Sequence, residues 1–154
     1  MICVTLTWHE IYMGAAVGIL RRIASLKRGE TNKVQNKDFG WHTDIEGALA
    51  ELAFAKAFNL HWNGSVNTFK VPDVGTIQIR HTQYPDGRLV VHDYDDDNTV
   101  HVLVTGTHPN YSIHGWLTGG QAKQQCFWDD PTGKFPAYFV PQAHLMPIDQ
   151  IGFQ

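Results

Sequence analysis

The sequence predicts an α/β (α+β) fold in which a mixed central β-sheet is flanked by helices within one domain, residues 1–154. Two patterns carry this prediction. Helix-capping signals and apolar residues at helical spacing occupy the first part of the chain, and short segments typical of strands follow from residue 76 onward. The chain is 43% hydrophobic, which is enough for one core and excludes general disorder.

The first helix is predicted over residues 7–27. Thr7 and Glu10 have the spacing of a capping box at its start, and Gly29 follows its end. Apolar residues recur along it at the spacing of one helix face: Ile11, Ala15, Ile19, Ile23 and Leu26. Residues 29–41 are polar and without periodicity, which predicts a mobile surface loop that can order against a ligand.

A second helix is predicted to begin the core, residues 43–148, and to end near Asn59. Thr43 and Glu46 form its expected capping box, and its nearly continuous apolar character indicates packing on more than one side. The cap accounts for Glu46, whereas Glu51 lies among apolar neighbours. A carboxylate there needs a metal, a basic side chain or backbone amides as a partner, or a path to the surface.

Strand-like segments fill the second half of the chain. Residues 76–82 and 88–93 flank a turn-forming sequence and are predicted to form a β-hairpin. Two further strands are expected at 99–105 and 111–117, followed by a short helix around 121–128 and a last strand at 137–140. The acidic run at 93–98 does not match an EF-hand and is predicted to be a solvated turn.

Four polar residues are candidates for one site. The period of two in the first strand places Gln78 and Arg80 on the same face, and Asp73 lies just before that strand. The preceding helix could bring Glu51 opposite them. Oxygen ligands and a cation would then converge, which is the equipment for hydrolysing a phosphodiester with Mg²⁺.

The predicted hairpin adds one candidate to this site. If its strands pair so that residue 82 faces residue 88, Gln78 lies opposite His92, which becomes an additional candidate metal ligand or base. His81 points to the other face and is expected to be a packed core residue.

A helix bearing Glu51, then Pro72-Asp73, then a strand carrying Gln78 and Arg80, resembles the PD-(D/E)XK nuclease superfamily. Further segments are similar to an uncharacterised phage-associated group within it, so that the resemblance covers most of residues 5–148: 45–51, 61–64, 73–75, 115–117 and 138–141.

This resemblance implies a restriction-endonuclease-like core and catalytic roles for Glu51, Asp73, Gln78 and Arg80. The first three would bind Mg²⁺ or Mn²⁺. Two of the four depart from the usual motif. Gln78 removes one negative charge from the metal site, and Arg80 is a poor general base because a guanidinium gives up its proton very reluctantly.

The expected partner is nucleic acid, with DNA before RNA, and a homodimer is a further candidate arrangement. Six basic residues in the first 40 could contact phosphates or form a solvated helix end and loop: Arg21, Arg22, Lys27, Arg28, Lys33 and Lys37. Neither a signal peptide nor a membrane span is indicated, so we expect a cytoplasmic protein, in the host cytoplasm if the chain is phage-encoded. A catalytically inactive module that keeps the nuclease fold is the alternative function.

Overall fold

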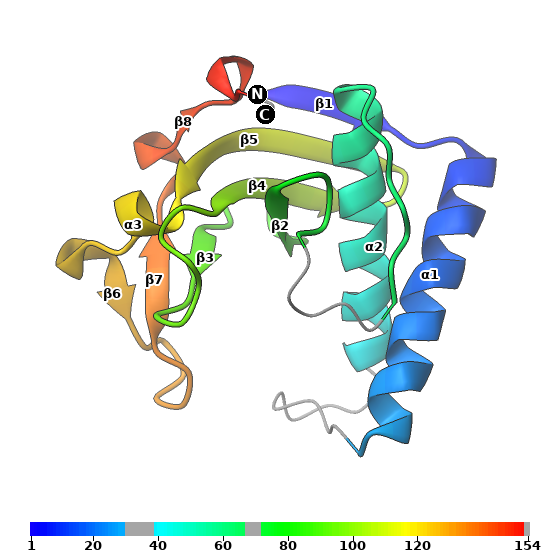
Figure 1. Cartoon of the computed structure of the whole chain (residues 1–154), viewed down its shortest axis with the longest axis horizontal. Coiled ribbons are helices and arrows are strands. Elements are labelled where there is room, and N and C mark those ends of the chain that lie inside the picture. Colours follow the sequence, from blue (N-terminus) through cyan, green and yellow to red (C-terminus); the bar gives the residue numbers. More distant parts are fainter. Residues whose placement is uncertain (30–38, 67–71, 153–154) are drawn as a thin grey trace.

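The computed structural model describes residues 1–29, 39–66 and 72–152, which form one mixed α+β domain. Two long helices lie on one face of a five-stranded sheet, and a smaller three-stranded sheet lies on the other face (Figure 1). Most of the loop predicted at 29–41, including Lys33 and Lys37, lies outside the described residues. No helix within the described ranges is long and apolar enough to cross a membrane.

Helix α1 (Trp8–Lys27) begins as predicted. Thr7 Oγ1 accepts a hydrogen bond from the amide of Glu10, and the Glu10 carboxylate accepts one from the amide of Thr7 at 2.6 Å. These reciprocal bonds confirm the capping box.

The packing face of α1 differs from the apolar stripe in the sequence. The buried residues are Gly14, Gly18 and Arg22, which lie against α2, whereas Ile19, Ile23 and Leu26 are exposed. A Cβ on Gly18 would lie 2.5 Å from the Cα of Ile45, so only glycine permits this approach of the two helices.

Helix α2 (Phe39–Ala57) begins four residues before the predicted start, so the capping box at Thr43 is wrong and residues 39–41 belong to a helix rather than a loop. Glu46 is buried instead of capping the helix. It accepts a hydrogen bond from the Tyr111 hydroxyl at 2.6 Å and from the backbone and ring of His108. Because Tyr111 and His108 bind the Glu46 carboxylate inside the domain, this side chain does not cap the helix.

The large sheet is mixed, as predicted. Its strands run in the order β1 (Ile2–Thr5), β5 (Asn110–Thr118), β4 (Val100–Thr107) and β2 (Ile77–Thr82), with β8 (Met146–Pro147) on β5. Only the β2–β4 pair is parallel; the other pairs are antiparallel. Strand β1 was not predicted, because four residues before a helix carry too little of a period-two pattern.

The predicted hairpin is wrong. Strand β3 (Leu89–Val91) pairs with β7 (Ala137–Val140), which pairs with β6 (Trp128–Asp129), and together they make the second sheet. The turn after β2 therefore carries the chain from one sheet to the other (Figure 1). Leu89 and Val91 are fully buried against the apolar face of the first sheet, and this burial outweighs local hairpin pairing.

Shorter helical segments complete the fold. The helix predicted at 121–128 is replaced by α3 (Gly119–Ala122) and a 3-10 turn (Gln125–Phe127), and two more 3-10 turns follow β7 (Gln142–His144 and Ile148–Gln150). One core lies between the large sheet and α2, and a second lies between the two sheets. Strand β2 is the edge strand of the large sheet, so one of its faces is turned towards the core with α2 and the other towards the second sheet.

Candidate active site at the edge strand

Asp73 is fixed at the free edge of β2. A turn with Gly75 at φ +60 brings Val74 back to pair with Ile77, so Asp73 lies alongside the strand that follows it. Its Oδ2 accepts a hydrogen bond from the amide of Ile79 at 2.7 Å. In the described sheet, β2 has a strand neighbour only on its β4 side, so this carboxylate satisfies an edge amide.

Glu51 of α2 is held by an arginine. Arg21 of α1 binds it with both terminal nitrogens, the second bond being 2.8 Å, and Trp62 Nε1 donates to the same carboxylate at 3.0 Å. The Nε of Arg21 donates to the carbonyl oxygen of Ser65. Of the partners considered for Glu51, the structure therefore shows an internal basic side chain, and the Glu51 side chain is only 7% exposed.

The charges of Glu51, Arg21 and Arg80 all act on Asp73. Burial, and then the negative charge of Glu51, raise the pKa of Asp73 to about 7, although the Ile79 amide and the two arginines oppose the shift. The charges of Glu51 and Arg80 are therefore near enough to act on Asp73, while the Asp73 carboxylate itself is bonded to the Ile79 amide.

Arg80 points away from α2, to the face that carries the small sheet. Its Nη2 donates to Asp95 Oδ2 at 2.7 Å, and the amide of His92 donates to the same oxygen at 2.8 Å. Burial favours a higher pKa for Asp95, but the His92 amide and the Arg80 charge outweigh it and hold the pKa below its ordinary value. The prediction of a merely solvated acidic turn is therefore wrong for Asp95.

His92 does not lie opposite Gln78, because β2 and β3 do not pair. The residue beside Gln78 in the parallel register is His101 of β4, and the ring of His92 stacks on Tyr94 instead. His92 contributes its backbone amide to the site, through Asp95. His81 is half-buried, and its Nε2 donates to the Gly106 carbonyl at 2.8 Å, which agrees with its predicted structural role.

His101 is the polar residue that the sequence analysis missed. It is 1% exposed, and among the described residues neither of its ring nitrogens has a hydrogen-bond partner. Burial, and then the positive charge of Arg80, lower its pKa to about 4, so the imidazole is neutral at pH 7. A histidine inside the apolar run 99–105 was the available signal, but only the parallel pairing places it beside Gln78.

The basic residues predicted to contact nucleic acid have different surroundings in the structure. Arg21 binds Glu51, and Arg22 is buried, with its Nη1 3.6 Å from a carboxylate oxygen of Asp44. Lys27 and Arg28 are exposed at the end of α1. Of the four described basic residues, these two are the ones exposed at this end of the helix.

The carboxylates at the edge suit a hard divalent cation. The described residues contain no group of three His, Cys, Asp or Glu side chains placed to hold a metal. Mg²⁺, however, commonly uses one or two carboxylates and completes its shell with water and substrate phosphates. Asp73 and Glu51 supply two, and the raised pKa of Asp73 marks a charge that a cation would stabilise. Both oxygens of Glu51 are occupied by Arg21 and Trp62 in this structure, so an ion that binds Glu51 would have to take the place of Arg21.

Comparison of the chain with models of protein families, with curated proteins and with solved structures found no match. Function must therefore be inferred from the residues at the sheet edge.

Proposed function

We propose that the chain is a metal-dependent phosphodiester hydrolase that acts on nucleic acid, with DNA as the expected substrate and the cytoplasm as its location. The observation that carries this proposal is the buried Asp73 at the free edge of β2, whose pKa is raised by burial and by the charge of Glu51. Perturbed carboxyl groups with specific charge partners are concentrated at functional sites. The resemblance of the same residues to the PD-(D/E)XK motif supports a restriction-endonuclease-like core.

Asp73 and Glu51 would hold Mg²⁺ or Mn²⁺, and the neutral carbonyl of Gln78 is the remaining oxygen donor that the motif provides. When bound, such an ion supplies Lewis-acid polarisation of the phosphate and an activated water. The protein itself supplies positioning. The Ile79 amide fixes Asp73, and Asp95 fixes the guanidinium of Arg80.

Arg80 is suited to bind a phosphate oxygen rather than to move a proton. Its guanidinium stays charged and offers several donors in a fixed plane. Its Nη2 is used by Asp95, and that bond orients the rest of the group. Water activation must therefore come from the bound ion, which makes the proposed activity strictly metal-dependent.

A specific observation favours a second function, a non-catalytic module that binds nucleic acid or protein. Both oxygens of Glu51 are occupied, by the fork of Arg21 and by Trp62, and Arg80 is paired with Asp95. In that case Arg21 takes the place of a metal ion as the partner of Glu51.

Cleavage assays separate the two functions. Purified protein is incubated with single- and double-stranded DNA and with RNA, in Mg²⁺, Mn²⁺ or EDTA. We expect cleavage that EDTA abolishes, a loss of at least about 100-fold in Asp73→Asn, and an unchanged rate in Asp86→Asn, whose carboxylate is exposed in the turn after β2. Intact substrates in both metals, or a full rate in Asp73→Asn, would refute the hydrolase. Metal-independent binding of the intact substrates would then support the module.

A further inference from the structure

The outer face of α1 is apolar. Seven large apolar side chains of this helix are exposed, with Trp8 at 79% and Tyr12 at 78%; the others are Met13, Ile19, Leu20, Ile23 and Leu26. At 3.6 residues per turn all seven fall within an arc of about 140°. Their exposed fractions correspond to on the order of 900 Å² of solvent-accessible surface, whereas the largest apolar patch of a typical monomer is about 300–600 Å².

The two faces of α1 are the reverse of those of an ordinary surface helix, because charged side chains face the domain and large apolar side chains face outward. Its two central arginines point inward, Arg21 to Glu51 and Arg22 into the contact with α2, and its small residues Gly14 and Gly18 make the intramolecular packing face. Figure 1 shows α1 on the far side of α2 from the sheet, and the exposed fractions show that its apolar arc is left largely uncovered by the domain. Such an arrangement is expected where the outer face is itself covered by a partner.

We propose that the outer face of α1 is the interface between two copies of this chain, which associate as an antiparallel α1–α1 pair around a two-fold axis. The exposed apolar area agrees with the roughly 800 Å² per partner that a standard interface buries. A two-fold axis places one patch against its own copy, so no second complementary surface is required.

The charges of α1 fit the antiparallel direction. Lys27 and Arg28 lie at its C-terminal end, whereas Glu10 in its first turn is already paired with Lys56 of the same chain. Antiparallel pairing keeps the two basic ends apart and opposes the helix dipoles, whereas parallel pairing would bring the two basic ends together.

A two-fold axis at the middle of this 20-residue helix, between positions 17 and 18, sets the contacts. Tyr12 then lies opposite the partner's Ile23, and Ala16 lies opposite the partner's Ile19. The small Ala16 at the centre allows close approach of the helices. Trp8 comes opposite the partner's Lys27, a pairing in which an ammonium group can lie over an indole ring.

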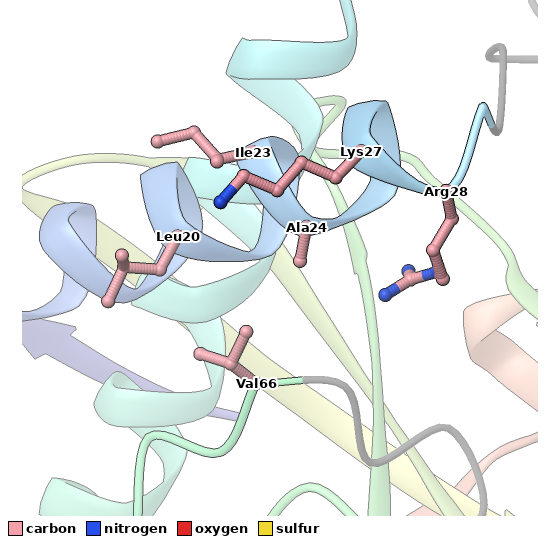
Figure 2. A pocket seen from close by; sticks show the side chains of 6 residues that line it. All are labelled: Leu20, Ile23, Ala24, Lys27, Arg28 and Val66. Atoms are coloured by element: carbon pink, nitrogen blue, oxygen red, sulfur yellow. The ribbon is translucent and has the colours of Figure 1, made fainter.

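A hollow at the C-terminal end of α1 accommodates part of the partner. It has a volume of about 430 Å³ and is lined largely by apolar groups, among them Leu20, Ile23 and Ala24 of α1, with Val66 facing Ala24 across the gap (Figure 2). The antiparallel arrangement brings the aromatic N-terminal turns of the partner's helix to this end. An aromatic side chain is of the size and polarity that the hollow can take.

Sedimentation velocity of the full chain at about 1–100 µM tests the interface, since standard-size interfaces span micromolar to picomolar affinity. We expect twice the monomer mass for the wild type, the monomer mass for Tyr12→Glu and for Ile19→Glu, and an unchanged dimer for the control Tyr94→Glu, which alters an 83% exposed aromatic residue outside α1. Circular dichroism checks that each variant is folded. A monomeric wild type at 100 µM, or folded Tyr12→Glu that stays dimeric, would overturn the proposal.

Cysteine cross-linking tests the direction of the pair, in a background in which the exposed Cys3 and Cys126 are replaced by serine. A mixture of Trp8→Cys and Lys27→Cys chains should form a mixed disulfide, and Trp8→Cys alone should not form one with itself. The reverse result would contradict the antiparallel arrangement. Binding of a monomeric protein to vesicles of phosphatidylcholine and phosphatidylglycerol, lost in Tyr12→Glu, would instead assign the face to a lipid surface and refute the dimer.

Discussion

Replacing Arg21 by alanine removes the counter-charge of Glu51. The Glu51 side chain is 7% exposed, and Arg21 binds it with two nitrogens, so among the described residues the variant leaves this buried carboxylate with the Trp62 hydrogen bond and no counter-charge. Breaking one side of a buried ion pair costs about 3–5 kcal/mol, because the remaining charge is desolvated and uncompensated. Since the Arg21 side chain is itself 23% exposed, we expect a loss of about 2–4 kcal/mol in the free energy of unfolding.

The opposite substitution should cost less. Glu51→Gln leaves Arg21 as the unpaired charge, and this side chain can reach water, so the expected loss is about 1–2 kcal/mol. Lys56→Ala provides the control, because it breaks a more exposed ion pair with Glu10 at 2.7 Å and should cost less than about 1 kcal/mol.

Urea denaturation in EDTA, followed by tryptophan fluorescence, measures all three variants, and Trp62 lies directly at the affected carboxylate. If Arg21→Ala costs no more than Lys56→Ala, the assignment of Arg21 as the partner of Glu51 is wrong. Addition of Mn²⁺ should then restore stability to Arg21→Ala more than to the wild type, because a bound cation can replace the lost positive charge.

Three further predictions concern the surroundings of the site. The pKa of Asp73 is about 7 in the folded state and ordinarily 3.8, so the folded protein holds a proton that stabilises it and loses this proton as the pH rises through 7. The melting temperature of the wild type should therefore fall relative to that of Asp73→Asn between pH 4 and 8. A constant difference between the two melting temperatures would contradict the shift. Gly18→Ala should destabilise by about 1–3 kcal/mol, because its Cβ meets backbone atoms of α2, whereas Gly47→Ala, with nothing within 4 Å, should stabilise by up to about 1 kcal/mol in thermal or urea unfolding. His101→Leu should leave the melting temperature unchanged or raise it, because the imidazole lacks protein partners; a fall of several degrees would show that a buried water or ligand pairs with it.

The parts of the fold that depend on local signals were predictable. The capping box at Thr7 and Glu10 and the strands β4 and β5 follow from residues close together in the sequence. The pairing of β2 was not, because the turn after it matches a hairpin equally well. Burial of Leu89 and Val91 between the sheets decides the pairing, and that burial exists only in the assembled structure.

The site was predictable in part for the same reason. The motif resemblance singled out Glu51, Asp73 and Arg80; the charges of Glu51 and Arg80 act on Asp73, but Arg80 is bound to Asp95 on the face away from α2. The role of Arg21 was missed because basic residues near a helix end usually face water. Its partner lies 30 positions away in another helix, and only the glycine-mediated contact of α1 with α2 brings the two side chains together.

The central claim is that Asp73 holds a divalent cation at the edge of β2. Diffraction from crystals soaked in Mn²⁺, measured at a wavelength where manganese scatters anomalously, tests it directly. The account predicts an anomalous peak within about 2.0–2.5 Å of a carboxylate oxygen of Asp73, with Glu51 as the next nearest carboxylate. Crystals that show Mn²⁺ elsewhere or not at all, with Glu51 still bound to Arg21, would contradict it.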